Sequence, residues 1–198
     1  MNTLSKKGQE TRKAILECAF ELFHERGIHA TSVDDILKQS GAGKSQFYHY
    51  FKNKQDIIHE LLQFAYQVIK NGEMHFNPIH TWDDFRGWLD GSIEKQEEHG
   101  CSRACPIGQI ICQLSDDDAL LRQDIKLVFD AMKDYPKSFF IGLQARGELI
   151  EGADPDEMAD MCIATMQGAA LLAKANSNIN VSKKTADHLF AYMRSLAK

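Results

Sequence analysis

The chain has 198 residues, 26% of them charged and 43% hydrophobic, a balance typical of a globular protein and not of a disordered or fibrous one. Its net charge of −5 conceals an asymmetry, because residues 1–55 carry nine Lys or Arg against six Asp or Glu, whereas residues 56–198 carry 14 against 22. The sequence has no apolar run near the roughly 20 residues of a membrane span and no secretory signal, and five cysteines are a poor disulfide framework, so we expect a cytoplasmic protein without a membrane partner.

Helical periodicity runs through almost the whole chain and no strand pattern stands out, which predicts an all-α protein. The first predicted helix begins near residues 8–11 and ends at Gly27, whose missing Cβ suits the position after a helix. Its core-facing stripe consists of Leu16, Ala19, Phe20 and Phe23. A second helix is predicted after the hydroxyls of Thr31 and Ser32, because a carboxylate three residues later completes the cap. Residues 40–43 break that helix.

The rest of the chain contains further amphipathic stretches that predict helices joined by polar or Gly- and Pro-containing turns. They cover about residues 44–50, 56–69, 82–98, 106–114, 118–147, a segment that begins at 154–155, and 182–197. Pro136 lies inside one of them. Because proline lacks a backbone N–H and its ring clashes with the preceding turn, it is expected to kink or split that helix.

The two short helices around residues 40–43 predict a helix-turn-helix, with Gly41 as the residue that tolerates a left-handed backbone in the turn. Phe47 and Phe51 lie four residues apart and can anchor the second helix. The side chains left on its outward faces are rich in hydrogen-bond donors and are Lys44, Ser45, Gln46, Tyr48 and His49. Such side chains suit base edges and phosphates in the major groove, although an ordinary helical hairpin with a solvated polar face is the alternative at this point.

The chain resembles the TetR family of bacterial transcriptional regulators. The resemblance is carried by residues 11–16, 26–27, 30–33 and 41–54, most diagnostically by the run Phe-Tyr-His-Tyr-Phe-Lys-Asn-Lys at 47–54, and more loosely by 144–149, 154–155 and 167–173. It implies a homodimer that binds double-stranded operator DNA and is no enzyme. It further implies a repressor that an unknown small-molecule effector releases, although an activator stays open. No cofactor is implied.

The resemblance also implies roles for particular residues. Positions that read bases are occupied by Lys44, Ser45 and Gln46, and positions that contact phosphate or line the groove by Thr31, Ser32, Tyr48, His49 and Lys54. The chain departs from the family pattern at Ala42 and Gly43, where a larger apolar residue and a hydroxyl cap are common. The weaker cap leaves the start of the reading helix less rigid.

The implied organisation is a helix-turn-helix DNA-binding domain over residues 1–55 and a helical effector-binding and dimerisation domain over 56–198. The dimer surface is expected on the last two predicted helices, whose stripes could otherwise be intramolecular core. Apolar and aromatic side chains from the middle helices are the candidates for the effector pocket, and each is otherwise an ordinary core residue. They are Phe64, Trp82, Trp88, Phe129, Met132, Phe139 and Phe140.

A short cysteine-containing segment adds a second hypothesis. Cys105 precedes the helix start expected at Pro106 and lies near Arg103, and both features favour a thiolate. The hypothesis is a thiol sensor for oxidants or electrophiles, centred on Cys105 with Cys101 or Cys112 as resolving thiol. The alternatives are a structural turn and a thiol-dependent enzyme, for which no partner base is identifiable. We expect no metal site, because the cysteines lack a second close pair.

Overall fold

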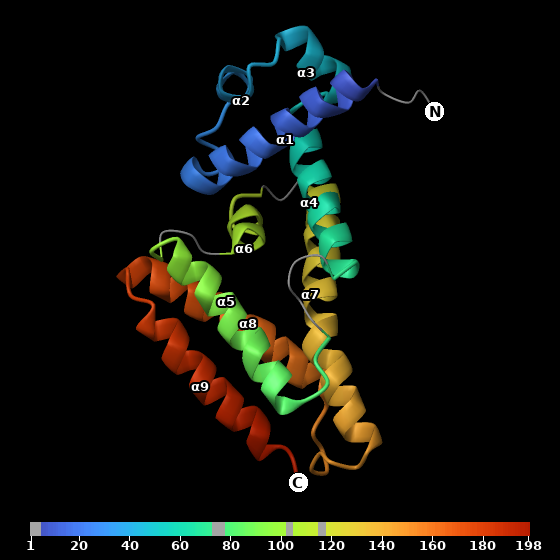
Figure 1. The fold of residues 1–198 in the computed structure, drawn as a ribbon, viewed down its shortest axis with the longest axis vertical. Coiled ribbons are helices and arrows are strands. Elements are labelled where there is room, and N and C mark those ends of the chain that lie inside the picture. The colour runs from blue at the N-terminus through green and yellow to red at the C-terminus, as the bar shows by residue number, and fades with distance from the viewer. Residues whose placement is uncertain (1–4, 73–77, 102–104, 115–117) are drawn as a thin grey trace. The chain divides into compact units, whose positions relative to one another are not determined.

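The computed structural model of the chain describes residues 5–72, 78–101, 105–114 and 118–198. Over these residues the fold is all-α, as predicted, and the only strand-like pairing there is an isolated bridge between Leu149 and Ala197. Figure 1 follows the helices along the chain: α1 (Lys6–Arg26), α2 (Val33–Ser40), α3 (Lys44–Tyr50), α4 (Lys54–Lys70), α5 (Trp82–Glu98), α6 (Pro106–Ile111), α7 (Ala119–Ala145), α8 (Pro155–Asn176) and α9 (Asn180–Ser195). In the described ranges, no helix combines the length and the apolar character that crossing a membrane requires.

The chain divides into two compact units. The N-terminal unit contains residues 1–65 and 109–126, and the C-terminal unit contains residues 66–108 and 127–198. The described residues of this second stretch, 109–114 and 118–126, therefore belong with the helix-turn-helix, from which they are distant in sequence. The independent domain boundary expected between residues 55 and 56 stays a prediction.

The helix ends of the N-terminal unit follow from local sequence. Gly27 ends α1 with a φ of +87°, as its missing Cβ predicts. Ser32 begins α2 with the predicted capping box, in which its Oγ accepts a hydrogen bond from Asp35 N at 3.1 Å and the Asp35 carboxylate accepts one from Ser32 N at 2.8 Å. Gly41 ends α2 in the left-handed region, with a φ of +68°. These signals place α2 and α3 as the sequence predicts.

The core of the N-terminal unit fixes which face of α3 points outward. Phe47 and Phe51 are fully buried, and so are apolar side chains of the neighbouring helices, namely Ile15, Ala19, Leu22 and Ile36. The anchoring role predicted for the two phenylalanines is confirmed. Because Phe47 lies inward, the remaining faces of the short α3 helix are turned to solvent.

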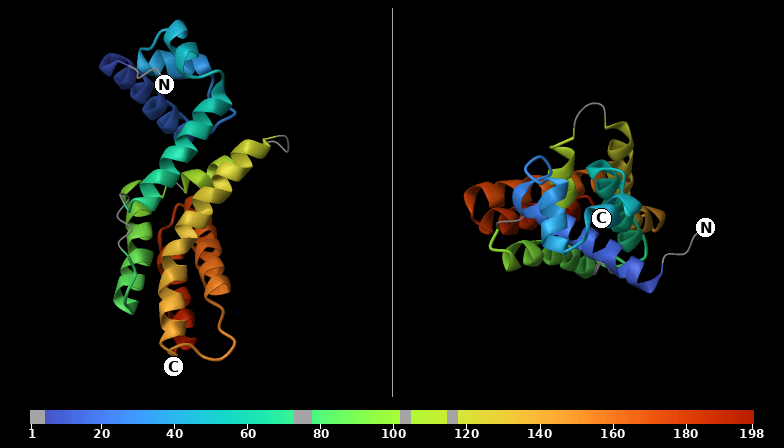
Figure 2. Two further views of the ribbon diagram at one scale, coloured as in Figure 1. Left: turned by 90° about the vertical axis from the view of Figure 1, so that its right-hand side faces the viewer. Right: turned by 90° about the horizontal axis from the view of Figure 1, so that it is seen from above.

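The C-terminal unit is built around an aromatic core. Phe85 of α5 is completely buried, and its ring contacts those of Trp82, Trp88, Phe139, Phe140 and Phe190. Helices α8 and α9 run antiparallel side by side, and α5 packs against both (Figures 1 and 2). A buried polar link joins the three helices, because Gln96 donates to Ala170 O at 2.8 Å and accepts from Ser182 Oγ at 2.8 Å.

Some predicted helix boundaries are corrected. Pro136 does not split α7, which is one continuous helix from Ala119 to Ala145. Proline removes a single helical hydrogen bond, and the buried side chains of Phe139, Phe140 and Leu143 hold the following turns in the core. Helix α4 begins two residues earlier than the predicted Asp56, and α6 ends at Ile111 instead of residue 114.

Candidate functional site

The outward face of α3 carries the five side chains that the sequence predicts there. Lys44, Ser45, Gln46, Tyr48 and His49 are all exposed, and Tyr48 retains 53% of its accessible surface. The Tyr48 ring stands edge-on against buried Phe47, with ring centroids 5.2 Å apart. This contact holds the ring in position while its hydroxyl end extends outward. The face thus presents ammonium, hydroxyl, amide and imidazole groups side by side.

The start of α3 is held by one of these side chains. Gly43 precedes the helix and has no side chain with which to cap it. Gln46 Oε1 instead accepts a hydrogen bond from Gly43 N at 2.8 Å, which supplies half of a capping box. Lys44 Nζ lies 3.9 Å from Asp34 Oδ1, and because both groups are largely exposed this ion pair is weak.

The turn between α1 and α2, residues 27–32, contains two neighbouring hydroxyls with different environments. Ser32 is exposed at the N-terminus of α2, and its hydroxyl and N–H hold the pKa of Asp35 below the usual value. Thr31 is only 1% exposed, and its Oγ1 donates to Gly27 O at 2.8 Å and Leu22 O at 3.3 Å. The Thr31 hydroxyl therefore closes the turn from inside, whereas Ser32 lies at the surface.

Two side chains from outside the turn hold it in place. Lys54 Nζ, at the start of α4, donates to Ile28 O at 2.6 Å and to Thr31 O at 2.9 Å, and partial burial lowers the pKa of Lys54. Gln113, which follows α6, accepts from Ile28 N at 2.7 Å. Both contacts were missed by sequence reasoning, because neither residue is near the turn in sequence and neither belongs to a local pattern.

A buried carboxylate joins α4 to the start of α7 within the same N-terminal unit. Asp124 is 4% exposed, and it accepts from Gln63 Nε2 at 2.8 Å and lies 2.5 Å from His59 Nδ1. A buried carboxylate requires such partners. No sequence signal distinguishes Asp124 from the exposed acidic residues around it.

The candidate effector residues fall into distinct environments. Phe139 and Phe140 are buried in the aromatic core of the C-terminal unit, and Trp82 and Trp88 are partly buried against it. The indole Nε1 of Trp88 is buried, and among the described residues it has no hydrogen-bond partner. Phe129 and Met132 are partly buried on α7, whereas Phe64 of the N-terminal unit is 66% exposed. The structure thus brings four of the seven together.

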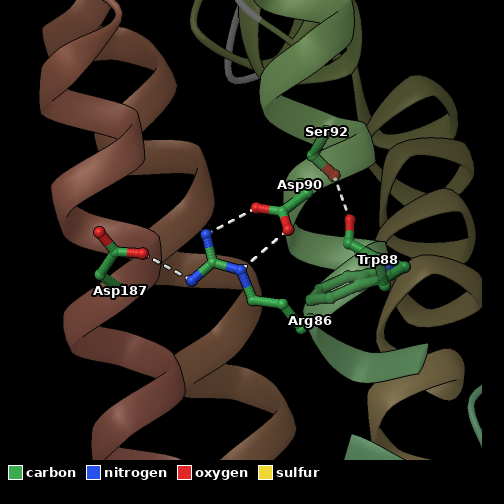
Figure 3. Close-up of polar contacts among 5 residues, drawn as sticks. All are labelled: Arg86, Trp88, Asp90, Ser92 and Asp187. Atoms are coloured by element: carbon green, nitrogen blue, oxygen red, sulfur yellow. Dashed lines mark hydrogen bonds and ion pairs between the residues drawn. The ribbon is translucent and has the colours of Figure 1, made fainter. Parts of the chain in front are cut away.

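An ion cluster beside this core joins α5 to α9. Figure 3 shows the Arg86 guanidinium between two carboxylates: it donates to Asp90 at 2.9 and 2.7 Å and to Asp187 at 2.6 Å. These hydrogen bonds, first the one to Asp90, raise the pKa of Arg86. In the same view Ser92 Oγ donates to Trp88 O at 3.2 Å, a bond within α5. The charged groups of the cluster pair with one another, so its role is to connect α5 to α9.

The cysteines differ sharply in accessibility. Cys105 is partly exposed just before Pro106 opens α6, and Cys112 is exposed. Cys101 is buried, with a φ of +61°, and Arg103, which the sequence places near Cys105, lies outside the described residues. Burial also raises the pKa of Cys162 to about 12, which keeps that thiol neutral. Over the described ranges, no group of three or more His, Cys, Asp or Glu could hold a metal ion.

Comparison with known proteins gives matches along most of the chain. Residues 15–61 match the family model for bacterial regulatory proteins of the tetR family, and residues 85–189 match the model for the tetracyclin repressor-like C-terminal domain. An uncharacterised HTH-type transcriptional regulator in the lacX 3′ region of Lactococcus lactis is 28% identical over 91% of this chain and 92% of its own length. The transcriptional repressor DhaR of a Mycobacterium strain is 25% identical over 84% of each chain.

Solved structures extend the comparison to the fold. A TetR transcriptional regulator from Chloroflexus aurantiacus superposes with a TM-score of 0.81 and 27% identity over 98% of both chains. The reduced form of E. coli NemR gives a TM-score of 0.82 at 18% identity over 96% of this chain and 97% of that one, which demonstrates a shared fold alone. The two compact units described above therefore have counterparts in regulators of known structure.

Proposed function

The chain belongs to the TetR family of bacterial regulatory proteins, and on that premise we propose that it is a repressor that a small-molecule effector releases from double-stranded operator DNA. The observation that carries the proposal is the exposed, donor-rich face of α3, held outward by buried Phe47. Relatives named as regulators favour this role over a catalytic one. A protein that binds bacterial chromosomal DNA works in the cytoplasm.

We assign the contacts as follows. Lys44, Ser45 and Gln46 face base edges, while Tyr48 and His49 contact the backbone or line the groove. Ser32 lies at the surface with its hydroxyl and N–H engaged by Asp35, and the N-terminus of α2 that it begins suits a phosphate. Thr31 and Lys54 support the reading face from within the protein, because their polar groups already bind the backbone of residues 22–31.

Replacing Lys44 with glutamine is expected to weaken operator binding about tenfold and to lower the slope of log affinity against log salt by about one, because one cation on the DNA is lost. The measurement is a binding titration at several salt concentrations with DNA upstream of the protein's own coding region, or with fragments from a genomic pull-down. Lys70→Gln is the matched control, since Lys70 is also an exposed lysine 3.9 Å from an aspartate. Unchanged binding by the Lys44 variant, or equal losses in both, contradicts the assignment.

We propose that the protein dimerises through α8 and α9. The surface of α8 that its own chain leaves exposed includes an apolar stripe of Met161, Ala164, Gly168, Leu171 and Leu172. Tyr192 of the adjacent α9 is also exposed. An apolar stripe of this kind is typical of an interface, and its small residues permit close helix approach. Two reading helices about 34–36 Å apart could then enter successive major-groove faces.

We propose that the effector binds beside the aromatic core of the C-terminal unit. The four candidate residues that the fold brings together there are Trp82, Trp88, Phe139 and Phe140. A buried donor without a partner costs free energy, so the Trp88 indole N–H favours an effector that carries a hydrogen-bond acceptor on an apolar or aromatic frame. An effector that binds the DNA-free arrangement more tightly lowers DNA affinity by linkage.

Thiol sensing through Cys105 is the second candidate function, favoured by the partial exposure of Cys105 at the start of α6. If it is correct, alkylation by N-ethylmaleimide releases the wild type from DNA, whereas Cys105→Ser stays bound at the same reagent concentration. Cys112→Ser is the matched control, because it removes an exposed thiol. Cys162 is expected to stay unlabelled in the folded protein, since it is buried and its pKa is about 12. Equal release of the Cys105→Ser variant and the wild type eliminates this function.

A further inference from the structure

The amide of Gln46 presents its two ends in different directions. A backbone N–H can pair only with an acceptor, so the 2.8 Å contact to Gly43 N fixes the amide oxygen toward the protein. The NH₂ group is left on the opposite side, in an exposed side chain, and has no partner among the described residues. The orientation of the amide therefore follows from hydrogen-bond chemistry.

This restriction changes which base edge the side chain matches. A glutamine with both amide ends available recognises adenine, because it donates to N7 and accepts from the N6 amino group. The bond from Gly43 N holds the oxygen toward the protein, so the NH₂ group is the end that faces the DNA. In the major groove guanine presents two neighbouring acceptors, O6 and N7, and no donor. Lys44, two residues earlier, also can only donate.

Building on the proposed function, we infer that Gln46 is a specificity-determining residue that selects guanine, and not adenine, at the base pair it faces. The capping role and the reading role are carried by opposite ends of one amide. Because Gly43 has no side chain, the Gln46 amide is the side-chain group that caps this end of α3.

The experiment selects binding sites for the full-length protein from a random DNA pool and sequences them. Wild type is expected to enrich a site in which one position in each half prefers guanine. Gln46→Glu preserves the cap, because a carboxylate also accepts from Gly43 N, but it has no donor and is expected to move that one position to cytosine, whose N4 donates. Affinity of this variant for the guanine site should fall about tenfold to a hundredfold.

Gln39→Glu is the matched control, because Gln39 is an exposed glutamine on α2 and the substitution changes charge identically. It is expected to keep the guanine preference, and Gln46→Ala is expected to make the position indifferent. The inference is overturned if the wild type enriches adenine at this position, or if Gln46→Glu loses affinity equally for all four bases there. Either result leaves the proposed function as a regulator unaffected. Failure of the folded wild type to enrich any sequence overturns both.

Discussion

Replacing both Leu171 and Leu172 with glutamate is expected to make the protein monomeric and to weaken operator binding about a hundredfold or more. These residues are 62% and 53% exposed on the apolar stripe of α8. Burying a carboxylate against a second copy of the same stripe leaves it without a cation or a donor, which is strongly unfavourable. When one subunit of a dimer is bound, the other is held close to its own half-site, which gives it a high effective concentration there. A monomer has no such advantage.

Two measurements separate this outcome from misfolding. Sedimentation gives the mass of the variant, and titration against whole and half operators gives its affinity for each. The monomer should bind both DNAs equally and weakly. Leu120→Glu is the matched control, because Leu120 is 60% exposed but lies on α7 in the N-terminal unit. A double variant that still sediments as a dimer shows that subunits meet through another surface.

Replacing Lys54 with methionine is expected to lower the free energy of unfolding by about 2–4 kcal/mol, since two charge-assisted hydrogen bonds to Ile28 O and Thr31 O are lost. Methionine retains most of the apolar stem, so packing changes little. The residue was predicted from sequence to contact phosphate, and the two roles have different consequences. If Lys54 contacted only DNA, its replacement would change the salt dependence of DNA binding and leave the free energy of unfolding unaltered.

The comparison uses urea unfolding at one fixed protein concentration, because dimer dissociation contributes to the apparent stability. Lys52→Met is the control, since Lys52 is exposed two residues earlier in the same segment. It should leave the unfolding midpoint unchanged. The contrary result is that Lys54→Met unfolds at the wild-type midpoint while the slope of log affinity against log salt falls by about one. In that case Lys54 is a phosphate contact, and its hydrogen bonds to Ile28 O and Thr31 O do not contribute to stability.

Most helix ends could be predicted because their causes are local. Gly27 fixes the end of α1, and the Ser32–Asp35 capping box and Gly41 fix the two ends of α2. Helices α3 and α5 have the predicted bounds for the same reason. Pro136 shows the limit of this reasoning, because proline's local penalty is outweighed by the burial of the side chains that follow it.

The contacts that support the reading face could not be predicted, because they join residues far apart in sequence. Nothing around Gln113 or Asp124 indicates that the first would bind Ile28 N and the second His59 and Gln63. Thr31 and Ser32 are adjacent hydroxyls with the same local propensity, and only tertiary packing makes one internal and the other exposed. Sequence therefore predicted the face that points outward better than it predicted what holds that face.

The packing of residues 109–126 with the helix-turn-helix bears on attempts to transplant DNA specificity between relatives. A chimera that exchanges only residues 1–65 would leave Gln113 and Asp124 from one parent against a turn and an α4 from the other. A parent with another residue at position 27 would add a Cβ 2.8 Å from Gln113 Oε1, and the Gln113 side chain would have to move away. The transplantable module is thus discontinuous: a functional swap must carry both stretches together.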